Sequence, residues 1–353
     1  MKLTELGWNE SLQNYFEEYK QTDYTFGRVV LEHKNVYQVI TENGEFLSEV
    51  SGKYRYHALS REDYPAVGDW VVLSERLQEG KATIHATLPR FSKFSRKIAG
   101  LTTEEQIVAV NVDTVFLVQS LNQDLNPRRL ERYLLMAWES GANPVVVLTK
   151  ADLCENIAAF TGEVESVAFG VPVHVISVVS GLGLAELSTY FAPGKTVALL
   201  GSSGAGKSTL TNYLLGEAKQ LVQNIREEDD KGRHTTTHRE LIQLPTGGLV
   251  IDTPGMRELQ LWEAESGLSY SFQDIEALAQ QCKFRDCTHQ KEPNCAVQHA
   301  IQIGLLEKER LQSYNKLQKE LAYLERKNDK RAQLAEKEKW KKIQASVPKT
   351  KKR

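Results

Sequence analysis

The chain has 353 residues, of which 41% are hydrophobic, and a formal net charge of -2. This length allows two or three domains with their own cores, and the overall charge does not by itself indicate a nucleic-acid binder. Apolar runs stay well below about 18 residues, and the first residues lack a basic segment followed by an apolar one. We therefore expect a cytoplasmic protein without a membrane segment.

The first part of the chain has the pattern of a small β-barrel. Residues 1–23 are amphipathic and predict a helical or partly ordered lead-in. Residues 24–100 contain five short alternating apolar runs separated by turns, which is typical of short antiparallel strands. The runs are Arg28–Leu31, Val36–Ile40, Glu45–Val50, Trp70–Leu73 and Ala82–Leu88.

Basic and aromatic side chains alternate near the end of this predicted barrel. Such a mixture suits an oligonucleotide-binding face, and it also suits an ordinary solvated surface with core aromatics. The residues are Tyr54, Arg55, Tyr56, His57, Arg61, Arg90, Lys93, Arg96 and Lys97.

Residues 101–265 contain the motifs of an α/β nucleotide-binding domain, of which a base-reading motif comes first. Thr149-Lys150-Ala151-Asp152 follows the apolar run of residues 144–148, so it lies at the carboxyl end of a predicted strand. Asp152 can accept two hydrogen bonds from the N1 and N2 edge of guanine, whereas adenine lacks that pair of donors. Lys150 would lie along the base plane, and Thr149 replaces the more usual Asn with a hydroxyl. Ser177 begins the loop after the next apolar strand and is predicted to close over the base.

The phosphate-binding motif follows. Gly201 to Ser208 fits G-x-x-x-x-G-K-[ST], with an apolar run before it and a helix-like stretch after it. Backbone N–H groups of this loop and the helix N-terminus favour a phosphate, Lys207 reaches the β- and γ-oxygens, and the Ser208 hydroxyl can coordinate Mg²⁺. A chance glycine-rich turn is the alternative. The predicted contacts are Gly201, Ser202, Ser203, Gly204, Ala205, Gly206, Lys207, Ser208 and Thr209.

The third motif is Asp252-Thr253-Pro254-Gly255. It follows the apolar residues 249–251, so Asp252 ends a predicted strand and suits a Walker-B role on Mg²⁺. The amide of Gly255 would sense the γ-phosphate. The next residue, Met256, cannot orient an attacking water as the Gln of many GTPases does, so another polar group must do so.

The order of these motifs is permuted, because an ordinary GTPase carries the base-reading motif after the other two. Chain termini in a domain often lie close together, so permutation leaves the core fold intact. It changes the connection: the segments that respond to the γ-phosphate now lead into the C-terminal region.

Residues 266–325 hold three of the four cysteines. Four cysteines are too few and too unevenly placed for a secreted disulfide framework. Cys282, Cys287, His289 and Cys295 match the ligand set of a closed tetrahedral zinc site, in a stretch polar enough to need a metal in place of a core. Reduced, unligated thiols beside a surface histidine are the alternative.

The end of the chain reads as a helix and a basic tail. Tyr314, Leu317, Leu321 and Leu324 recur at helical spacing and predict packing on the zinc module. Residues 326–353 hold twelve Lys or Arg against three acidic residues, and such a tail can neutralise RNA phosphates or remain solvated.

Together with Gly232-Arg233-His234-Thr235-Thr236-Thr237, the permuted motifs and the cysteine cluster resemble the circularly permuted ribosome small-subunit-dependent GTPase A family (RsgA), over roughly residues 24 to 300. The resemblance implies an OB-fold for the barrel. It points to His234 as the residue that positions the attacking water and to Thr236 as the switch ligand of Mg²⁺. From the residues alone, His234 fits a solvated loop equally well, and Thr235 or Thr237 fits the ligand role.

We therefore expect a permuted P-loop GTPase between an OB-fold barrel and a helical zinc module. It would hydrolyse GTP to GDP with Mg²⁺ and bind one structural Zn²⁺. The resemblance implies the small (30S) ribosomal subunit and its rRNA as partners, a role in late assembly of that subunit, and a monomer. Two alternatives are a nucleotide-gated RNA-binding scaffold with incidental hydrolysis and a P-loop enzyme that acts on ATP.

Overall fold

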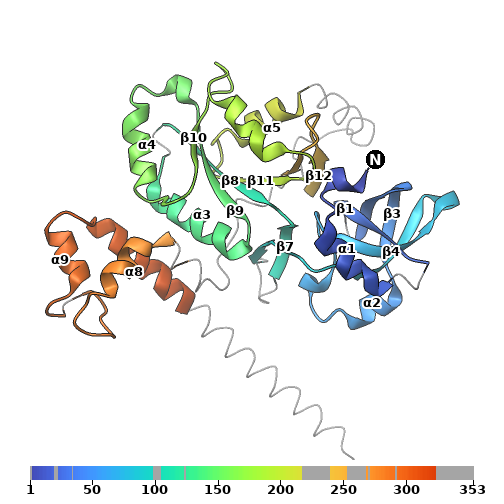
Figure 1. The fold of residues 1–353 in the computed structure, drawn as a ribbon, viewed down its shortest axis with the longest axis horizontal. Helices are drawn as coiled ribbons and strands as arrows, with labels where there is room; N and C mark the ends of the chain where they lie inside the picture. The colour runs from blue at the N-terminus through green and yellow to red at the C-terminus, as the bar shows by residue number, and fades with distance from the viewer. Residues whose placement is uncertain are drawn as a thin grey trace, which may run out of the picture. The chain divides into compact units, whose positions relative to one another are not determined.

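The computed structural model describes residues 2–19, 23–33, 35–97, 105–122, 125–216, 239–252, 268, 271–290 and 292–322. The chain divides into two compact units, residues 1–260 and 261–353. The first unit contains the predicted barrel and the predicted nucleotide-binding domain (Figure 1).

Five strands form the closed N-terminal barrel, in the order β1-β2-β3-β5-β4 with β4 pairing back to β1. Their cluster of buried residues includes Val29, Tyr37, Val39, Phe46 and Ile84. Each of the five predicted runs overlaps one strand, so the predicted barrel is confirmed. The strands are β1 (Thr25–His33), β2 (Val36–Thr41), β3 (Gly44–Val50), β4 (Trp70–Arg76) and β5 (Lys81–Thr87), with helix α2 (Gly52–His57) and the short 3-10 helices η3 (Arg61–Asp63) and η4 (Leu77–Glu79) between them.

The first residues of the chain are helical and pack on this barrel. They form η1 (Leu3–Leu6), α1 (Glu10–Phe16) and η2 (Glu17–Tyr19). The ring of Trp8 stacks on that of Phe26, with the two ring centroids 3.7 Å apart. It also packs edge-to-face with the ring of Trp70, with the centroids 4.9 Å apart. Because aromatic rings bury large areas, these contacts hold the lead-in against the barrel.

The nucleotide-binding domain is built on a mostly parallel sheet. Its strands follow the order β10-β9-β8-β11-β13-β12, in which β12 alone is antiparallel to its neighbour β13. Before this sheet, β6 (Lys93–Lys97) and β7 (Glu105–Val110) form a separate antiparallel pair. The sheet strands are β8 (Thr114–Ser120), β9 (Asn143–Thr149), β10 (Val173–Val175), β11 (Thr196–Gly201), β12 (Arg239–Gln243) and β13 (Leu249–Asp252).

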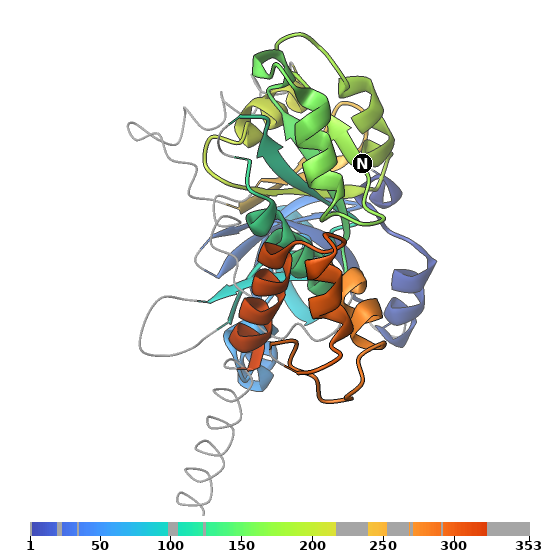
Figure 2. The same ribbon diagram turned by 90° about the vertical axis from the view of Figure 1, so that its left-hand side faces the viewer.

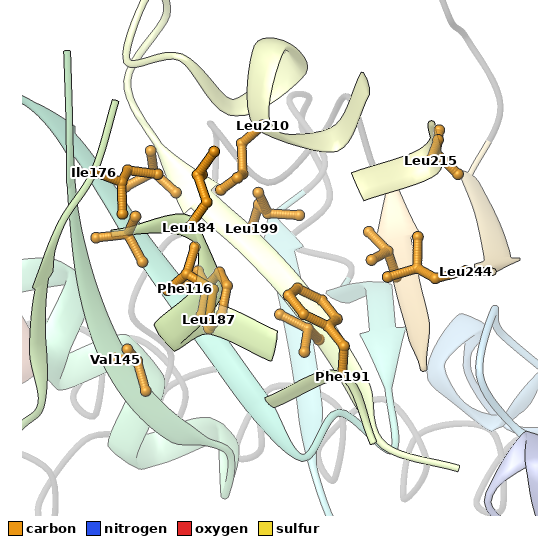
Figure 3. Close-up of a cluster of buried hydrophobic side chains, with 14 of the residues drawn as sticks. Phe116, Val145, Ile176, Leu184, Leu187, Phe191, Leu199, Leu210, Leu215 and Leu244 are labelled. Carbon is orange, nitrogen blue, oxygen red and sulfur yellow. The ribbon is translucent and has the colours of Figure 1, made fainter. Parts of the chain in front are cut away.

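Helices enclose the sheet because its strands are apolar on both faces. Phe116, Leu199 and their neighbours pack with Leu187 and Phe191 of η6 (Leu184–Phe191) and with Leu210 of α5 (Lys207–Leu215), as Figure 3 shows. Helix α3 (Pro127–Ser140) contacts β8 and β9, and α4 (Ile157–Glu165) contacts α3 and β10. The short η5 (Ala151–Leu153) follows β9.

The second unit is helical and is coloured orange to red in Figures 1 and 2. It contains α8 (Gln273–Ala279), α9 (Ala296–Gln302) and a helical run at 308–322. The buried guanidinium of Arg310 donates to both carboxylate oxygens of Asp274, at 2.5 and 2.8 Å. Tyr314, Leu317 and Leu321 are buried, which confirms the predicted apolar stripe; Leu324 lies outside the described residues.

Candidate nucleotide and metal sites

The predicted nucleotide-binding residues gather at one edge of the sheet. Strands β9, β10, β11 and β13 are parallel to one another through the ladder, so their carboxyl ends share that edge. The three motifs and the loop of Ser177 follow these four strand ends. Ligands of open α/β sheets bind outside the carboxyl ends of the strands.

The phosphate loop has the backbone that its glycines allow. Gly204 and Gly206 have φ values of 81° and 90°, a region that glycine enters without a steric penalty. A Cβ atom at Gly201 would lie 2.3 Å from the carbonyl oxygen of Val118, so the loop starts tightly against β8. The ammonium of Lys207 donates to the carbonyl oxygens of Gly201 and Ser202, each at 2.6 Å. This side chain therefore lies folded over the loop, where an anion would meet it.

The base-reading motif is joined to the phosphate loop by one hydroxyl. Thr149 Oγ1 is buried and donates to the carbonyl oxygen of Ala205 at 2.7 Å, with the carbonyl of Gln119 at 3.3 Å. Thr149 also packs under Gly206, where an added Cβ would lie 3.2 Å from that hydroxyl. Sequence reasoning placed Thr149 near the base, but it did not find this bond between two loops that are far apart in the chain.

A second hydroxyl holds the predicted guanine-binding carboxylate. Ser177 is fully buried, and its hydroxyl donates to Oδ1 of Asp152 at 2.5 Å. The amide of Ser180 donates to the same hydroxyl at 3.1 Å, which keeps the Ser177 side chain in place. Lys150 has a φ of 60°, so the chain turns sharply between the strand and Asp152. Ser177 thus orients Asp152, and Asp152 remains exposed toward the edge.

The residues predicted for hydrolysis are described only in part. Asp252 is the last residue of β13, as predicted, and its backbone pairs with Glu240 of β12. Ser208 and Thr209 are exposed in the first turn of α5. His234, Thr235, Thr236, Thr237, Gly255 and Met256 lie outside the described residues, as does the side chain of Asp252.

The predicted metal ligands converge in the second unit. The ligand atoms of Cys282, Cys287, His289 and Cys295 all lie within 4.8 Å of one another, so the cluster can hold a metal ion. His289 has a φ of 57°, which turns the chain at the ligand, and Cys295 precedes α9 and accepts from the amide of Gln298. The fourth cysteine, Cys154, lies outside this cluster.

The basic and aromatic residues of the barrel do not all face solvent. The guanidinium of Arg90 donates to both carboxylate oxygens of the fully buried Asp69, at 2.8 and 2.7 Å. The hydroxyl of Tyr54 contacts the Asp63 carbonyl and the Thr87 hydroxyl. Arg90 therefore does not belong to an exposed basic surface, contrary to the sequence prediction. Arg55, Tyr56, His57 and Arg61 are exposed, Lys93 pairs with Glu62, and the side chains of Arg96 and Lys97 lie outside the described part.

A buried cation that sequence reasoning missed lies where the barrel meets the nucleotide-binding domain. Arg28 is 2% exposed and donates to the carbonyl oxygens of Leu6, Gly68 and Asn111. Burial lowers the pKa of this guanidinium to about 10, which leaves it charged at neutral pH. In the sequence, Arg28 is visible only as an arginine at the start of an apolar run, and an exposed residue of an edge strand gives the same pattern.

Within the described part of the chain, no helix is both long and apolar enough to cross a membrane.

Comparison with known proteins identifies the family. A family model described as RsgA GTPase matches residues 87–262. A second, described as ABC transporter, matches residues 184–347, a range that includes the phosphate loop found in many NTPases.

Curated relatives match nearly the whole chain. "Small ribosomal subunit biogenesis GTPase RsgA 1" of Oceanobacillus iheyensis is 51% identical over 90% of each chain. A protein named RsgA 2 of Lactiplantibacillus plantarum is 52% identical over 86% of this chain and 85% of its own, and RsgA of Opitutus terrae is 46% identical over 97% and 96%.

Two solved structures share the fold. YjeQ from Thermotoga maritima has a TM-score of 0.64 and 29% identity, covering 85% of this chain and 99% of its own. YloQ, described as a circularly permuted GTPase, has a TM-score of 0.60 and 27% identity, covering 85% and 95%. The permuted order read from the motifs is therefore confirmed, and the chain belongs to the RsgA family of GTPases.

Proposed function

We propose that this GTPase acts in assembly of the small ribosomal subunit, binding GTP at the edge formed by β9, β10, β11 and β13. The observation that carries the nucleotide site is the bond from Thr149 to Ala205, because it joins a base-reading motif to a phosphate loop. Gly201 to Thr209 would surround the phosphates, and Lys207 would leave its loop carbonyls to contact the β- and γ-oxygens.

Guanine selectivity follows from the bond between Ser177 and Asp152. A carboxylate held in one orientation can accept from both N–H groups on the guanine edge, whereas adenine would leave it without those donors. Binding sites that reject a base in this way discriminate strongly, because the unpaired carboxylate has lost its water. Lys150 would lie along the base.

Hydrolysis needs a positioned water and charge stabilisation. In our proposal His234 orients the water, Gly255 contacts the γ-phosphate through its amide, and Lys207 offsets the negative charge that develops. Ser208, Thr236 and Asp252 would hold Mg²⁺, which supplies charge neutralisation on the phosphate oxygens.

The metal of the second unit is proposed to be Zn²⁺. With Zn–S bonds of about 2.3 Å and Zn–N bonds of about 2.0–2.1 Å, a tetrahedral site has S···S edges of about 3.8 Å and S···N edges of about 3.5 Å. The Sγ atoms of Cys282 and Cys295 are 3.9 Å apart, and they lie 3.6 and 3.5 Å from Nδ1 of His289. Four protein ligands leave no open position, which favours a structural role.

The assignment to the small ribosomal subunit comes from the names of the relatives, which are small ribosomal subunit biogenesis GTPases. The exposed Arg55, Tyr56, His57 and Arg61 of the barrel suit contact with its rRNA. A cytoplasmic monomer fits this role.

The test is GTP hydrolysis by the purified, zinc-loaded protein with and without small subunits, with large subunits and ATP as controls. We expect small subunits to stimulate GTP hydrolysis and large subunits not to stimulate it. Equal rates with and without them, at intact GTP binding, would refute the ribosomal role. His234→Ala should dock on the subunit but fail to be released after GTP binding; unaltered release would favour a nucleotide-gated scaffold in which hydrolysis is incidental.

A further inference from the structure

Strand β1 belongs to two parts of the first unit at once. Its first half, Thr25–Arg28, pairs with β4 and closes the barrel. Its second half pairs with β12 of the nucleotide-binding sheet, Leu31 opposite Glu240 and Glu32 opposite Arg239. The pairing of β1 with β2 has an irregularity between Val29 and Leu31. At this point the strand on the other side of β1 changes from β4 to β12. The barrel and the sheet therefore share one strand.

This shared strand lies close to the proposed Mg²⁺ ligand. Glu240 pairs with Leu31 on one side and with Asp252 on the other. Asp252, Glu240 and Leu31 thus form one row across three hydrogen-bonded strands. Two strand spacings amount to about 10 Å. A shift of β12 by a fraction of that distance has to move β1, strain their pairing or break it.

A second joint fixes the barrel at another point. Nε of Arg28 donates to the carbonyl of Gly68 at 3.2 Å, and its Nη2 donates to the carbonyl of Asn111 at 3.1 Å. The side chain of Asn111 donates to the carbonyl of Gly68, also at 3.1 Å. A Cβ atom on Gly68 would lie 2.2 Å from the carbonyl oxygen of Val110, so the backbones touch here. This joint is buried and closely packed, whereas the β1–β12 pairing spans only two register positions.

We propose that the β1–β12 pairing carries the nucleotide state of the GTPase site to the barrel, with the contact of Arg28, Gly68 and Asn111 as the fixed point. Strand β12 begins at Arg239, two residues after the end of the segment 232–237 that contains the proposed His234 and Thr236, and it pairs with the strand of Asp252. In our proposal, β12 thus adjoins one set of the ligands of the γ-phosphate and Mg²⁺ along the chain and Asp252 across the β12–β13 ladder. Coupling is reciprocal, so a partner that docks on the barrel alters nucleotide affinity through the same pairing.

This inference rests on the proposed function only for its GTP site; it requires no ribosome. It is therefore tested first by amide hydrogen exchange, with the full chain bound to GDP or to a non-hydrolysable GTP analogue. The expected result is that exchange in residues 25–41, in β1 and β2, differs between the two nucleotides by at least about fivefold, the lower range of allosteric coupling. Identical exchange in this region would overturn the proposal.

Two variants cut the pairing, one from each strand. Adjacent pairs of an antiparallel ladder alternate between hydrogen-bonded and non-hydrogen-bonded types, so either Leu31 or Arg239 donates its N–H across this ladder. Leu31→Pro and Arg239→Pro together cover both cases, because proline has no N–H. Leu31→Ala and Arg239→Ala are matched controls that keep the backbone donor. Thermal unfolding and GTP affinity identify any variant that fails to fold.

At least one proline variant should lose the nucleotide dependence of exchange in β1 and β2, while both alanine variants keep it. The same variant should lose at least about fivefold of the difference in small-subunit affinity between the GTP-analogue and GDP forms. Folded proline variants that both retain wild-type nucleotide dependence would overturn the proposal. If small subunits never stimulate the wild type but exchange behaves as expected, the ribosomal role fails and the coupling stands.

Discussion

The hydroxyl of Thr149 donates a 2.7 Å hydrogen bond to the carbonyl oxygen of Ala205, and this bond ties the base-reading motif to the phosphate loop. The threonine stands where many GTPases carry asparagine. Its short side chain suffices because Gly206 leaves room for it, with a hypothetical Cβ only 3.2 Å from the hydroxyl. The base-reading motif and the phosphate loop, which are far apart in the sequence, are thus joined by one buried hydroxyl.

Replacing Thr149 by valine should weaken GTP binding. Valine keeps the shape but leaves the Ala205 carbonyl without its donor, a loss of about 1–3 kcal/mol for a buried acceptor. We expect roughly a tenfold lower GTP affinity, measured by calorimetry. Thr149→Ser keeps the hydroxyl and should bind within about threefold of wild type. Equal affinities of the valine and serine variants would contradict this role.

Replacing Ser177 by alanine should reduce the preference for GTP over ATP. The Asp152 carboxylate loses its 2.5 Å donor and becomes free to rotate away from the base. We expect GTP affinity to fall by about tenfold with little change for ATP, as measured in competition binding. Ser180→Ala in the same loop is the control, because Ser180 uses its backbone amide in the described contact. A uniform loss for both nucleotides would point to misfolding of the loop.

Removing the Zn²⁺ that we propose for the second unit should unfold that unit and leave nucleotide binding intact. Structural Zn²⁺ contributes about 10–16 kcal/mol in zinc-finger peptides, because metal binding and folding occur together there. We expect Cys295→Ser, or chelation, to abolish the thermal unfolding transition of the second unit. Elemental analysis should then find less than one zinc per chain. Cys154→Ser should change neither, since Cys154 lies outside the cluster. Retention of one zinc per chain by Cys295→Ser would show that the cluster is not the site.

The Arg90–Asp69 pair should be a large contributor to barrel stability. Arg90→Met leaves a fully buried carboxylate without its bidentate partner, which costs about 3–5 kcal/mol. Urea unfolding measures this loss. Lys93→Met breaks the exposed pair with Glu62 and should cost less than about 1 kcal/mol. The double variant Asp69→Asn/Arg90→Met should recover part of the loss, and no recovery would mean that Arg90 acts mainly through its other contacts, among them its hydrogen bonds to the carbonyl oxygens of Glu62 and Tyr64.

His85 should make the stability of the barrel depend on pH. Burial lowers its pKa in the folded state, where its ring stacks on Tyr24 and its Nε2 lies 2.9 Å from the Ser74 hydroxyl. The unfolded chain therefore binds a proton more readily, and the stability present above the unfolded pKa of about 6.5 is lost as pH falls through the folded value. Unfolding midpoints between pH 7.5 and 5 should fall more steeply for wild type than for His85→Gln. Parallel pH profiles would exclude this contribution.

The local motifs could be predicted because each is a short stretch whose residues act together. The phosphate loop, with its strand before and helix after, is a feature of neighbouring residues, and so is the turn from β9 into Asp152. The four predicted metal ligands lie within fourteen consecutive residues, so they meet with little help from the rest of the fold. The alternation of the barrel strands likewise follows from residues two positions apart.

Contacts between distant segments could not be predicted in this way. Composition cannot tell whether an arginine faces solvent or a buried carboxylate. The prediction that Arg90 belongs to an exposed basic surface was therefore wrong, because its guanidinium binds the buried Asp69. Arg28 was missed for the same reason, since its three carbonyl partners come from three separate segments.

The sequence by itself determined the motifs of the chain: the TKAD segment with its carboxylate, a phosphate-loop motif, their permuted order and a cluster of three cysteines and a histidine. Only the tertiary structure decided how these parts are joined. The bonds from Thr149 to Ala205 and from Ser177 to Asp152, and the row of Asp252, Glu240 and Leu31, each depend on which strands become neighbours. Strand neighbours are selected by the packing of the whole sheet, because every strand satisfies its backbone hydrogen bonds with whichever partner the assembled core brings beside it.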